Sequence, residues 1–478
     1  MFDDSPGKKR AFRLALGPRL VVNFCPVKAR FLFLTFLALV LASCDLRRQP
    51  PTPIIPTPGP TAIPFSEQLA LSQAQTIIDP ATDIRPQADP EILALVEQVS
   101  TQNLMGYVYG LQSYGTRNTF SVTDEEDFGI GAARRWLFDE FVRVGNGRLR
   151  VEFQDYSFNF LGLSTTQRNI IATLPGEDPN AGAIVMMANY DTRTGDWIDG
   201  ESLSPGADDN GSGVAAMLEV ARLMSSRNWN QTVIFAAFTA EEQGTYGSRH
   251  FVQQAFLAGI DIDAAINNDM IGGRNGIPQT VRIYSEGPTT SVSRHLARYI
   301  DYLGGIYLPI FPIWMMDGLD REGRWGDQRE FVNAGYASVR IIESQEDEDI
   351  QNSVRDVWNR IDYQYLKQVT SLNLIALSSA AAGPPRPDVP VVIADDGGSV
   401  RVGWTPHERA AAYVVSIRPF DIEGDRFGPF RFVGADNAGD VLLTGYNPAQ
   451  PYAVSIAGVD EQGRLGLFSS PEVVIYER

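Results

Sequence analysis

The sequence is poor in cysteine and carries no excess of positive charge, and each shortage excludes a class of protein. Only Cys25 and Cys44 occur among 478 residues, which excludes a disulfide-rich scaffold. The formal net charge is −18, so the basic surface that a general nucleic-acid binder needs is not expected, and we predict no nucleic-acid partner. The composition, 44% hydrophobic and 21% charged, is that of a globular protein, and the length predicts two or three domains.

Residues 1–43 are typical of a removable leader. Basic residues between Lys8 and Arg30 precede an uncharged stretch, 31–43, that is too short to span a bilayer as a mature helix. The stretch ends in Leu-Ala-Ser-Cys44, which resembles a lipobox, the signal in which the cysteine is lipidated and becomes the new N-terminus. We therefore predict an extracytoplasmic lipoprotein that is anchored to a membrane through Cys44. An ordinary signal peptide with an incidental cysteine remains the alternative.

The rest of the chain divides into three parts. Residues 44–65 hold the run PPTPIIPTPGPTAIP, which favours an extended polyproline spacer. Residues 66–383 are predicted to form an α/β domain with a mostly parallel sheet flanked by helices. Strands are expected at 184–188, 232–238, 264–268 and 338–342, and helices at 92–99, 130–142, 214–223 and 365–381.

Residues 384–478 are predicted to form a small all-β sandwich. A Gly-Pro-Pro-Arg-Pro segment begins at 383, and short alternating strands follow at 399–404, 412–417 and 452–457. This part resembles a fibronectin type III domain, with Trp404 at the place of the core tryptophan and residues 447–452 similar to a tyrosine corner. Such modules bind partners or act as spacers, and the sequence does not choose between these roles.

Acidic residues gather just after the predicted strands of the α/β domain. They are Asp191, Asp208, Asp209, Glu241, Glu242 and Asp269. In an open α/β sheet the carboxyl ends of the strands meet at the ligand crevice, so these side chains are expected to converge. Because clustered carboxylates repel one another, such a place normally holds a cation.

The segments around these residues resemble the family-28 zinc aminopeptidases over about residues 111–381. The similar segments are LQSYGTRNTF, RNIIATLPG, ANYDT, PGADDNGSG, FTAEEQGTYGS, NNDMIGG, GDQREFVNAGY and VRDVWNRIDYQYL. PGADDNGSG followed by a Glu-Glu pair is the most specific of these signals. The resemblance implies a zinc aminopeptidase fold, two zinc ions and a peptide substrate.

The resemblance also implies a role for each acidic residue. Asp209 matches the carboxylate that bridges two metals, Glu242 a ligand of one metal and Asp269 a ligand of the other. Glu241 matches the general base, and Asp191 the acid that orients a metal ligand. A base beside a metal-activated water can take a proton from that water and pass it to the leaving amine, which is the chemistry of peptide hydrolysis.

Two positions depart from the family pattern. Where the family has histidine ligands, this sequence has Asn189 and Asn352, one for each metal. Zinc prefers imidazole and thiolate, whereas a set made only of oxygen atoms suits calcium, magnesium or manganese. Three hypotheses stay open. The centre is metal-free, it binds a single structural cation, or it binds manganese or weakly held zinc and still supports hydrolysis.

The three histidines of the chain offer little replacement. His250 is near Glu242 in sequence, His295 lies in a predicted helix, and His407 belongs to the C-terminal module. A packed or surface position is the expected role of each.

We therefore expect an exported metallo-aminopeptidase-like enzyme that removes N-terminal residues from peptides. The alternative is a catalytically inactive pseudo-peptidase that acts as a surface binding lipoprotein. A related metal enzyme of the glutaminyl-cyclase type is a third possibility that no residue selects. Substrate preference and oligomeric state stay open.

Overall fold

The structure is a computed structural model that describes residues 85–321, 323–394, 399–421, 426–427, 432–435, 439–443 and 451–475. The predicted leader, Cys44, the Pro-rich segment and most of the predicted tyrosine corner lie outside the described residues. Among the helices of the described ranges, none has the length and apolar character needed to cross a membrane. The lipid anchor therefore stays a prediction.

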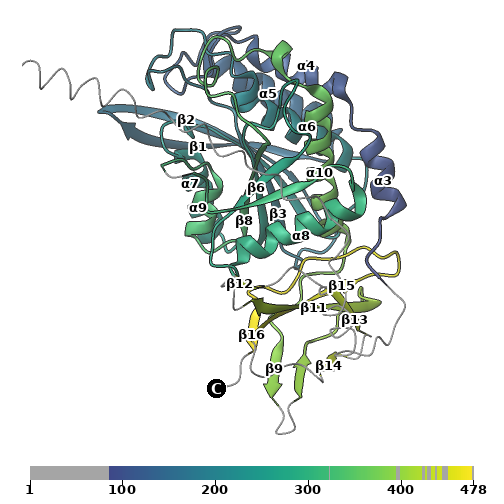
Figure 1. The fold of residues 1–478 in the computed structure, drawn as a ribbon. Helices are drawn as coiled ribbons and strands as arrows, with labels where there is room; N and C mark the ends of the chain where they lie inside the picture. The colour runs from purple at the N-terminus through teal and green to yellow at the C-terminus, as the bar shows by residue number, and fades with distance from the viewer. Residues whose placement is uncertain are drawn as a thin grey trace, which may run out of the picture. The chain divides into compact units, whose positions relative to one another are not determined.

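An eight-stranded mixed sheet runs through the main domain in the order β1-β2-β4-β3-β5-β8-β6-β7 (Figure 1). The strands are β1 (Arg150–Phe160), β2 (Leu163–Leu174), β3 (Ala183–Asn189), β4 (Thr232–Phe238), β5 (Ile262–Asn268), β6 (Val281–Ser285), β7 (Ile313–Asp317) and β8 (Ser338–Glu343). The inner strands β4, β3, β5 and β8 pair in parallel, as do β6 and β7. The pairs β1–β2, β2–β4 and β6–β8 are antiparallel.

Helices cover both faces of this sheet. They are α3 (Pro90–Glu97), α4 (Thr101–Gln112), α5 (Gly129–Gly145), α6 (Gly213–Met224), α7 (Tyr246–Leu257), α8 (Val292–Tyr307), α9 (Gln328–Asn333) and α10 (Tyr363–Ala382), with short helical turns at η1 (Ala207–Ser212) and η2 (Trp358–Arg360). Helices α3, α4, α5, α6, α8 and α10 pack on one face, and α7 and α9 on the other.

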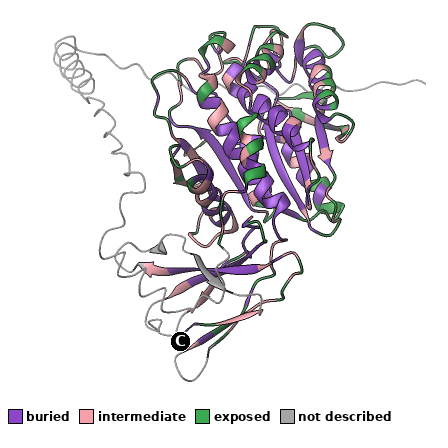
Figure 2. Ribbon diagram, turned by 90° about the vertical axis from the view of Figure 1, so that its right-hand side faces the viewer, coloured by how far each residue is buried: buried purple, intermediate pink, exposed green. Residues whose placement is uncertain are grey.

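The inner strands show why two helical layers form. Every residue of β3 is buried, as the purple strands in Figure 2 show. Ile184 and Met186 belong to the core under α6 and α10, whereas Val185 and Met187 belong to the core under α7. Since side chains alternate along a strand, a continuous apolar run needs cover on both sides.

The predicted fold class is confirmed, and all four predicted strands and four predicted helices of this domain are present. The sheet is less uniformly parallel than expected, because β1 and β2 form a long antiparallel hairpin at its edge. The register pairs Phe160 with Leu163, which leaves Leu161 and Gly162 as a two-residue turn with φ of 50° and 85°. The sequence reading missed this hairpin, whose alternating residues mix apolar and charged side chains.

The C-terminal part forms antiparallel sheets. Its strands are β9 (Val391–Ala394), β10 (Val400–Gly403), β11 (Ala412–Asp421), β12 (Arg426–Phe427), β13 (Phe432–Ala435), β14 (Asp440–Leu443), β15 (Tyr452–Val459) and β16 (Val473–Ile475). One sheet has the order β14-β10-β9, and the other contains β12-β11-β15-β16 with β13 paired to β11. Trp404 packs against this core, 5.2 Å from the Tyr413 ring. The chain changes from helix to strand between α10 and β9, and both the domain boundary at 383–384 and the type III identity stay predictions.

A buried charged cluster joins α8 to the C-terminal strands. Arg418 and Glu472 form an ion pair with both side chains fully buried, and His295 Nδ1 lies 3.6 Å from Glu472 Oε1. Arg298 Nη1 lies 3.8 Å from the same carboxylate. Burial, together with the nearby Arg298 and Arg418, lowers the pKa of His295 to about 4, against the raising effect of Glu472.

We predict that His295 makes folding stability fall in mild acid. The folded-state pKa lies below the ordinary value of 6.5, so the stability that neutral His295 contributes is present above pH 6.5 and is lost as pH falls towards about 4. Between pH 7 and pH 5 the wild-type chain should lose about 2 kcal/mol more unfolding free energy than His295→Gln. Urea unfolding at both pH values measures this. His407→Gln should keep the wild-type difference, and equal slopes for the wild type and His295→Gln would contradict the prediction.

Candidate active site

The Glu-Glu pair lies in a sharp turn just after β4, and Asp191 holds that turn in place. Ala240 has a φ of 54°, which turns the chain out of the strand. The Asp191 carboxylate then accepts the backbone N–H groups of Glu241 and Glu242 at 3.3 and 3.2 Å, and the Thr119 hydroxyl at 3.3 Å. Burial raises the pKa of Asp191 to about 7, although the amide hydrogen bonds lower it. Asp191 thus positions the two glutamates through their backbone.

Asp209 lies in the turn η1 before α6, and a second buried carboxylate holds that turn. Asp356 accepts the backbone N–H groups of Asp208 and Asp209 at 2.9 and 3.0 Å. The fully buried Arg117 donates to the carbonyls that lead into the turn, among them that of Gly206 at 2.8 Å. These contacts bring Asp209 to the carboxyl ends of the strands, as the sequence predicted.

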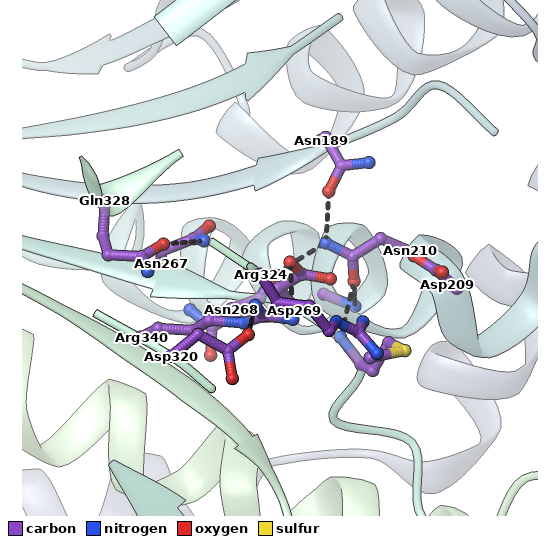
Figure 3. Close-up of polar contacts among 12 residues, drawn as sticks. Asn189, Asp209, Asn210, Asn267, Asn268, Asp269, Asp320, Arg324, Gln328 and Arg340 are labelled. Carbon is purple, nitrogen blue, oxygen red and sulfur yellow. Dashed lines mark hydrogen bonds and ion pairs between the residues drawn. The ribbon is translucent and has the colours of Figure 1, made fainter. Parts of the chain in front are cut away.

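The side chain of Asp209 is hydrogen-bonded within the protein. Gln351 Nε2 donates to Asp209 Oδ2 at 2.9 Å. Arg324 Nη1 in turn donates to Gln351 Oε1 at 3.2 Å (the Arg324 side chain is drawn in Figure 3). Burial raises the pKa of Asp209, while the Gln351 hydrogen bond and the nearby Arg324 lower it.

Asp269 follows β5 and pairs with an arginine from the neighbouring strand. Arg340 Nη2 lies 2.9 Å from Asp269 Oδ2, and the other guanidinium nitrogen pairs with Asp320 (Figure 3). The side chain of Arg340 is only 2% exposed, and that of Asp269 is 7% exposed. Burial raises the pKa of Asp269 to about 6, against the lowering effect of Arg340.

Glu242 pairs with a second arginine. Arg193 Nε lies 2.7 Å from Glu242 Oε2, and the Arg193 guanidinium also stacks over the Trp197 ring at 5.3 Å. Glu241 is different, because no donor or cation among the described residues lies within hydrogen-bonding distance of its carboxylate. Burial, followed by the negative charges of Asp269 and Glu242, raises the pKa of Glu241 well above its ordinary value.

Of the two asparagines at the expected histidine positions, Asn189 has side-chain hydrogen bonds within the protein. Asn189 Oδ1 accepts from Asn210 Nδ2 at 2.7 Å (Figure 3). Asn189 Nδ2 donates to the backbone carbonyl of Asp191 at 3.3 Å. Asn352 has a left-handed φ of 56°, and its neighbour Gln351 supplies the contact to Asp209. The assignment of both asparagines as metal ligands therefore stays a prediction without geometric support.

No histidine reaches the centre. His250 stacks on Tyr156 with ring centroids 5.3 Å apart, and His295 belongs to the cluster with Glu472. His407 Nδ1 accepts the backbone N–H of Arg409 at 3.2 Å in the C-terminal module. The expectation that these histidines are packed or peripheral agrees with these positions.

These residues do not fit a pair of zinc ions. Among the described residues, no three carboxylate, imidazole or thiolate groups meet in an arrangement that could hold a metal ion. Oxygens of Asp269 and Glu242 are bonded to guanidinium groups, and one of Asp209 to an amide. Zinc favours nitrogen and sulfur ligands, and no histidine or cysteine among the described residues lies at this centre. We therefore assign no chemical step to a bound metal.

The residues that the sequence reading missed are the partners of the carboxylates: Arg193, Arg324, Arg340 and Gln351. One of them left a signal in the sequence. Arg340 interrupts the apolar run of Ser338–Glu343, and a charge inside a buried strand requires a buried partner. The other three lie in irregular segments, where spacing predicts no direction for a side chain.

Comparisons with known proteins agree with the expected family and fold. The model of peptidase family M28 matches residues 169–377. A protein of Pyricularia oryzae named a probable zinc metalloprotease is 31% identical over 339 residues, covering 62% of this chain and 68% of the relative. A probable zinc metalloprotease of Leptosphaeria maculans is 30% identical over 342 residues, covering 64% of this chain and 79% of the relative.

Solved structures are similar in fold. LapB from Legionella pneumophila gives a TM-score of 0.52 at 21% identity, over 66% of this chain and 80% of LapB. The LapA aminopeptidase of the same organism gives 0.51 at 20% identity, over 61% of this chain and 75% of LapA. Identities this low support the fold alone.

We predict that Asp191→Ala destabilises the domain, because the backbone N–H groups of Glu241 and Glu242 lose their acceptor. The unfolding free energy should fall by about 2 kcal/mol, the usual cost of leaving buried donors unsatisfied. Asp196→Ala is the matched control, since Asp196 accepts the backbone N–H of Ile198 at 3.1 Å on the exposed surface. That variant should change stability by about 0.5 kcal/mol or less. Equal losses in urea unfolding would show that Asp191 does not hold the turn.

Proposed function

Because this chain belongs to peptidase family M28, we propose that its carboxylate centre receives the amino-terminal end of peptides outside the cytoplasm. Family and fold together make the domain a metallopeptidase-like hydrolase domain. One observation carries the finer proposal. Glu241 is partly exposed and keeps an unpaired carboxylate at the centre, whereas the neighbouring Glu242 and Asp269 are ion-paired.

An ammonium group is the natural partner for such a carboxylate. A negative charge in partly buried surroundings is unfavourable until a cation or a donor reaches it. The free amino group of a peptide supplies both a positive charge and three N–H donors, and a charge-assisted hydrogen bond is stronger than a neutral one. Arg193 pairs with Glu242 and stacks over the Trp197 ring, and together these two side chains offer an amphipathic surface to the residues that follow the N-terminus.

The centre could either cleave the bound peptide or bind it without hydrolysis. If the domain cuts peptides, Glu241 is the residue placed to take a proton from the attacking water. The relatives are named zinc metalloproteases, and zinc is a property of those proteins. The second candidate function is peptide binding without hydrolysis, which the ion pairs of Asp269 and Glu242 favour.

Export is part of the proposal. Residues 1–43 have the order of a lipoprotein leader, and the Pro-rich run after Cys44 would hold the folded domains away from a membrane. Extracellular or periplasmic peptides are then the partners that the centre meets. The C-terminal sheets form a second folded surface on the same anchored chain.

We predict that Glu241→Gln weakens binding of a peptide with a free N-terminus by about tenfold or more, since a charge-assisted hydrogen bond is lost. Isothermal titration with the free and the N-acetylated peptide measures this, and the acetylated form should bind equally weakly to both proteins. Any peptidase activity should be abolished in the same variant. Glu152→Gln, on the exposed side of the edge strand β1, is the matched control and should bind like the wild type. Unchanged affinity in Glu241→Gln would contradict the proposal.

We predict that Cys44 anchors the exported chain. Expressed with its leader in a bacterial host, the wild type should incorporate labelled fatty acid and fractionate with membranes. Cys44→Ser should do neither, whereas Cys25→Ser, which changes the other cysteine, should behave as the wild type does. Membrane fractionation and fatty-acid labelling that persist in Cys44→Ser would refute the lipobox.

A further inference from the structure

We infer that Arg193 and Arg340 supply the positive charge that metal ions supply in the zinc aminopeptidases. The centre is then complete without metal, and it binds peptide ends without cutting them. The part of this inference that concerns peptides rests on the proposed function. The part that concerns metal rests only on the contacts of the arginines.

The sheet itself directs Arg340 into the centre. Arg340 on β8 lies opposite Asn267 on β5 in the parallel register. Asp269 follows Asn267 by two residues, so it leaves the strand on the same face of the sheet. The guanidinium spans the gap and pairs with Asp269 on one side and Asp320 on the other, while the side chain of Asp320 is fully buried.

Arg193 makes the equivalent contact for Glu242. It lies two residues beyond Asp191, whose carboxylate holds the backbone of the Glu241–Glu242 turn. The position of Arg193 relative to Glu242 is therefore fixed from both sides, by the turn and by the stacking on Trp197. The contact lies inside the protein, since the side chain of Glu242 is only 8% exposed.

Asp209, the expected bridging carboxylate, is satisfied by a neutral donor and a more distant cation. Gln351 donates to it directly, and Arg324 holds Gln351. Each of the three carboxylates expected to bind metal thus has a protein partner. A metal ion bound by these three carboxylates would have to compete with two guanidinium groups and an amide for their oxygens.

The replacement of metal ions by arginine side chains explains how the carboxylates remain close together. Buried like charges repel each other, and buried carboxylates are stable only when they are paired or hydrogen-bonded. A guanidinium suits this place because it is always charged and presents several donors in a fixed plane. Unlike a metal, it has no vacant coordination position at which a water could be made nucleophilic. Glu241 keeps its acceptor oxygens for a ligand, but it faces no activated water.

The test is the response of the full mature chain to metal ions. We expect the wild type to bind no stoichiometric zinc in elemental analysis after dialysis against it. Neither zinc nor a chelator should shift its melting temperature, and it should not hydrolyse aminoacyl or peptide substrates in zinc or manganese. Bound zinc at one or two equivalents, with a melting temperature that falls on chelation, would overturn the inference.

The variant Arg340→Gln gives a more specific test of the inference. It leaves Asp269 without an ion-pair partner and Asp320 with Arg321 alone, so the melting temperature should fall by about 5 °C or more, and calcium or manganese should recover part of the loss. Arg282→Gln is the matched control, because Arg282 Nη2 pairs with Glu346 at 2.8 Å on the same sheet outside the centre. That variant should show no recovery by cations. A lack of cation response in Arg340→Gln would count against the replacement of metal charge.

A variant that fails to fold leaves two other measurements. Arg193→Gln removes a side chain that is 22% exposed and should show the same cation response at a smaller loss of stability. The wild-type zinc measurement needs no variant at all. Peptide affinity is measured separately with chelator present. If peptides fail to bind while zinc is also absent, the proposed function fails and the metal-free centre stands.

Discussion

The ion pair between Arg340 and Asp269 is the contact on which the rest of the centre depends. Parallel strands bring their carboxyl ends to one edge, and the chain places acidic side chains there from several segments. Such a gathering is unstable without positive charge, because burial and mutual repulsion both oppose ionisation. Arg340 supplies this positive charge from β8, the strand adjacent to β5, which leads into Asp269.

The carboxylates divide into two groups by what they hold. Asp191 and Asp356 accept backbone N–H groups, and so fix the turns that carry Glu241, Glu242 and Asp209. Glu242 and Asp269 pair with arginines instead. Asp191 and Asp356 hold the backbone turns of the peptidase-like domain, whereas Glu242 and Asp269 have arginine side chains as their charge partners. This division is the basis of our inference that arginines stand in for metal ions on a retained peptidase fold.

Much of the fold could be predicted from the sequence, because the signals were local. The apolar runs at β3, β4, β5 and β8 gave the inner strands, and the order of strands and helices gave the parallel core. The long hairpin β1–β2 was missed, since its mixed apolar and charged alternation resembles an exposed segment. The convergence of Asp191, Asp209 and the Glu-Glu pair followed from their positions after the strands.

The partners of these side chains could not be predicted in the same way. Gln351 contacts Asp209 from a segment far along the chain. Arg193 pairs with Glu242 because the Asp191 carboxylate holds the backbone turn that carries Glu242. Such contacts depend on tertiary geometry, which residue spacing does not encode. The resemblance led us to expect Asn189 and Asn352 at the histidine positions, but residue spacing gave no sign of the arginines that pair with Glu242 and Asp269.

The most direct measurement is a crystal structure of the mature chain soaked in zinc, with anomalous data collected at the zinc absorption edge. The metal-free account predicts no anomalous peak among Asp209, Glu242 and Asp269, with the Arg340 guanidinium still on Asp269 and the Arg193 guanidinium still on Glu242. A strong peak between these carboxylates, with both arginines turned away, would contradict it and restore a metal-dependent hydrolase.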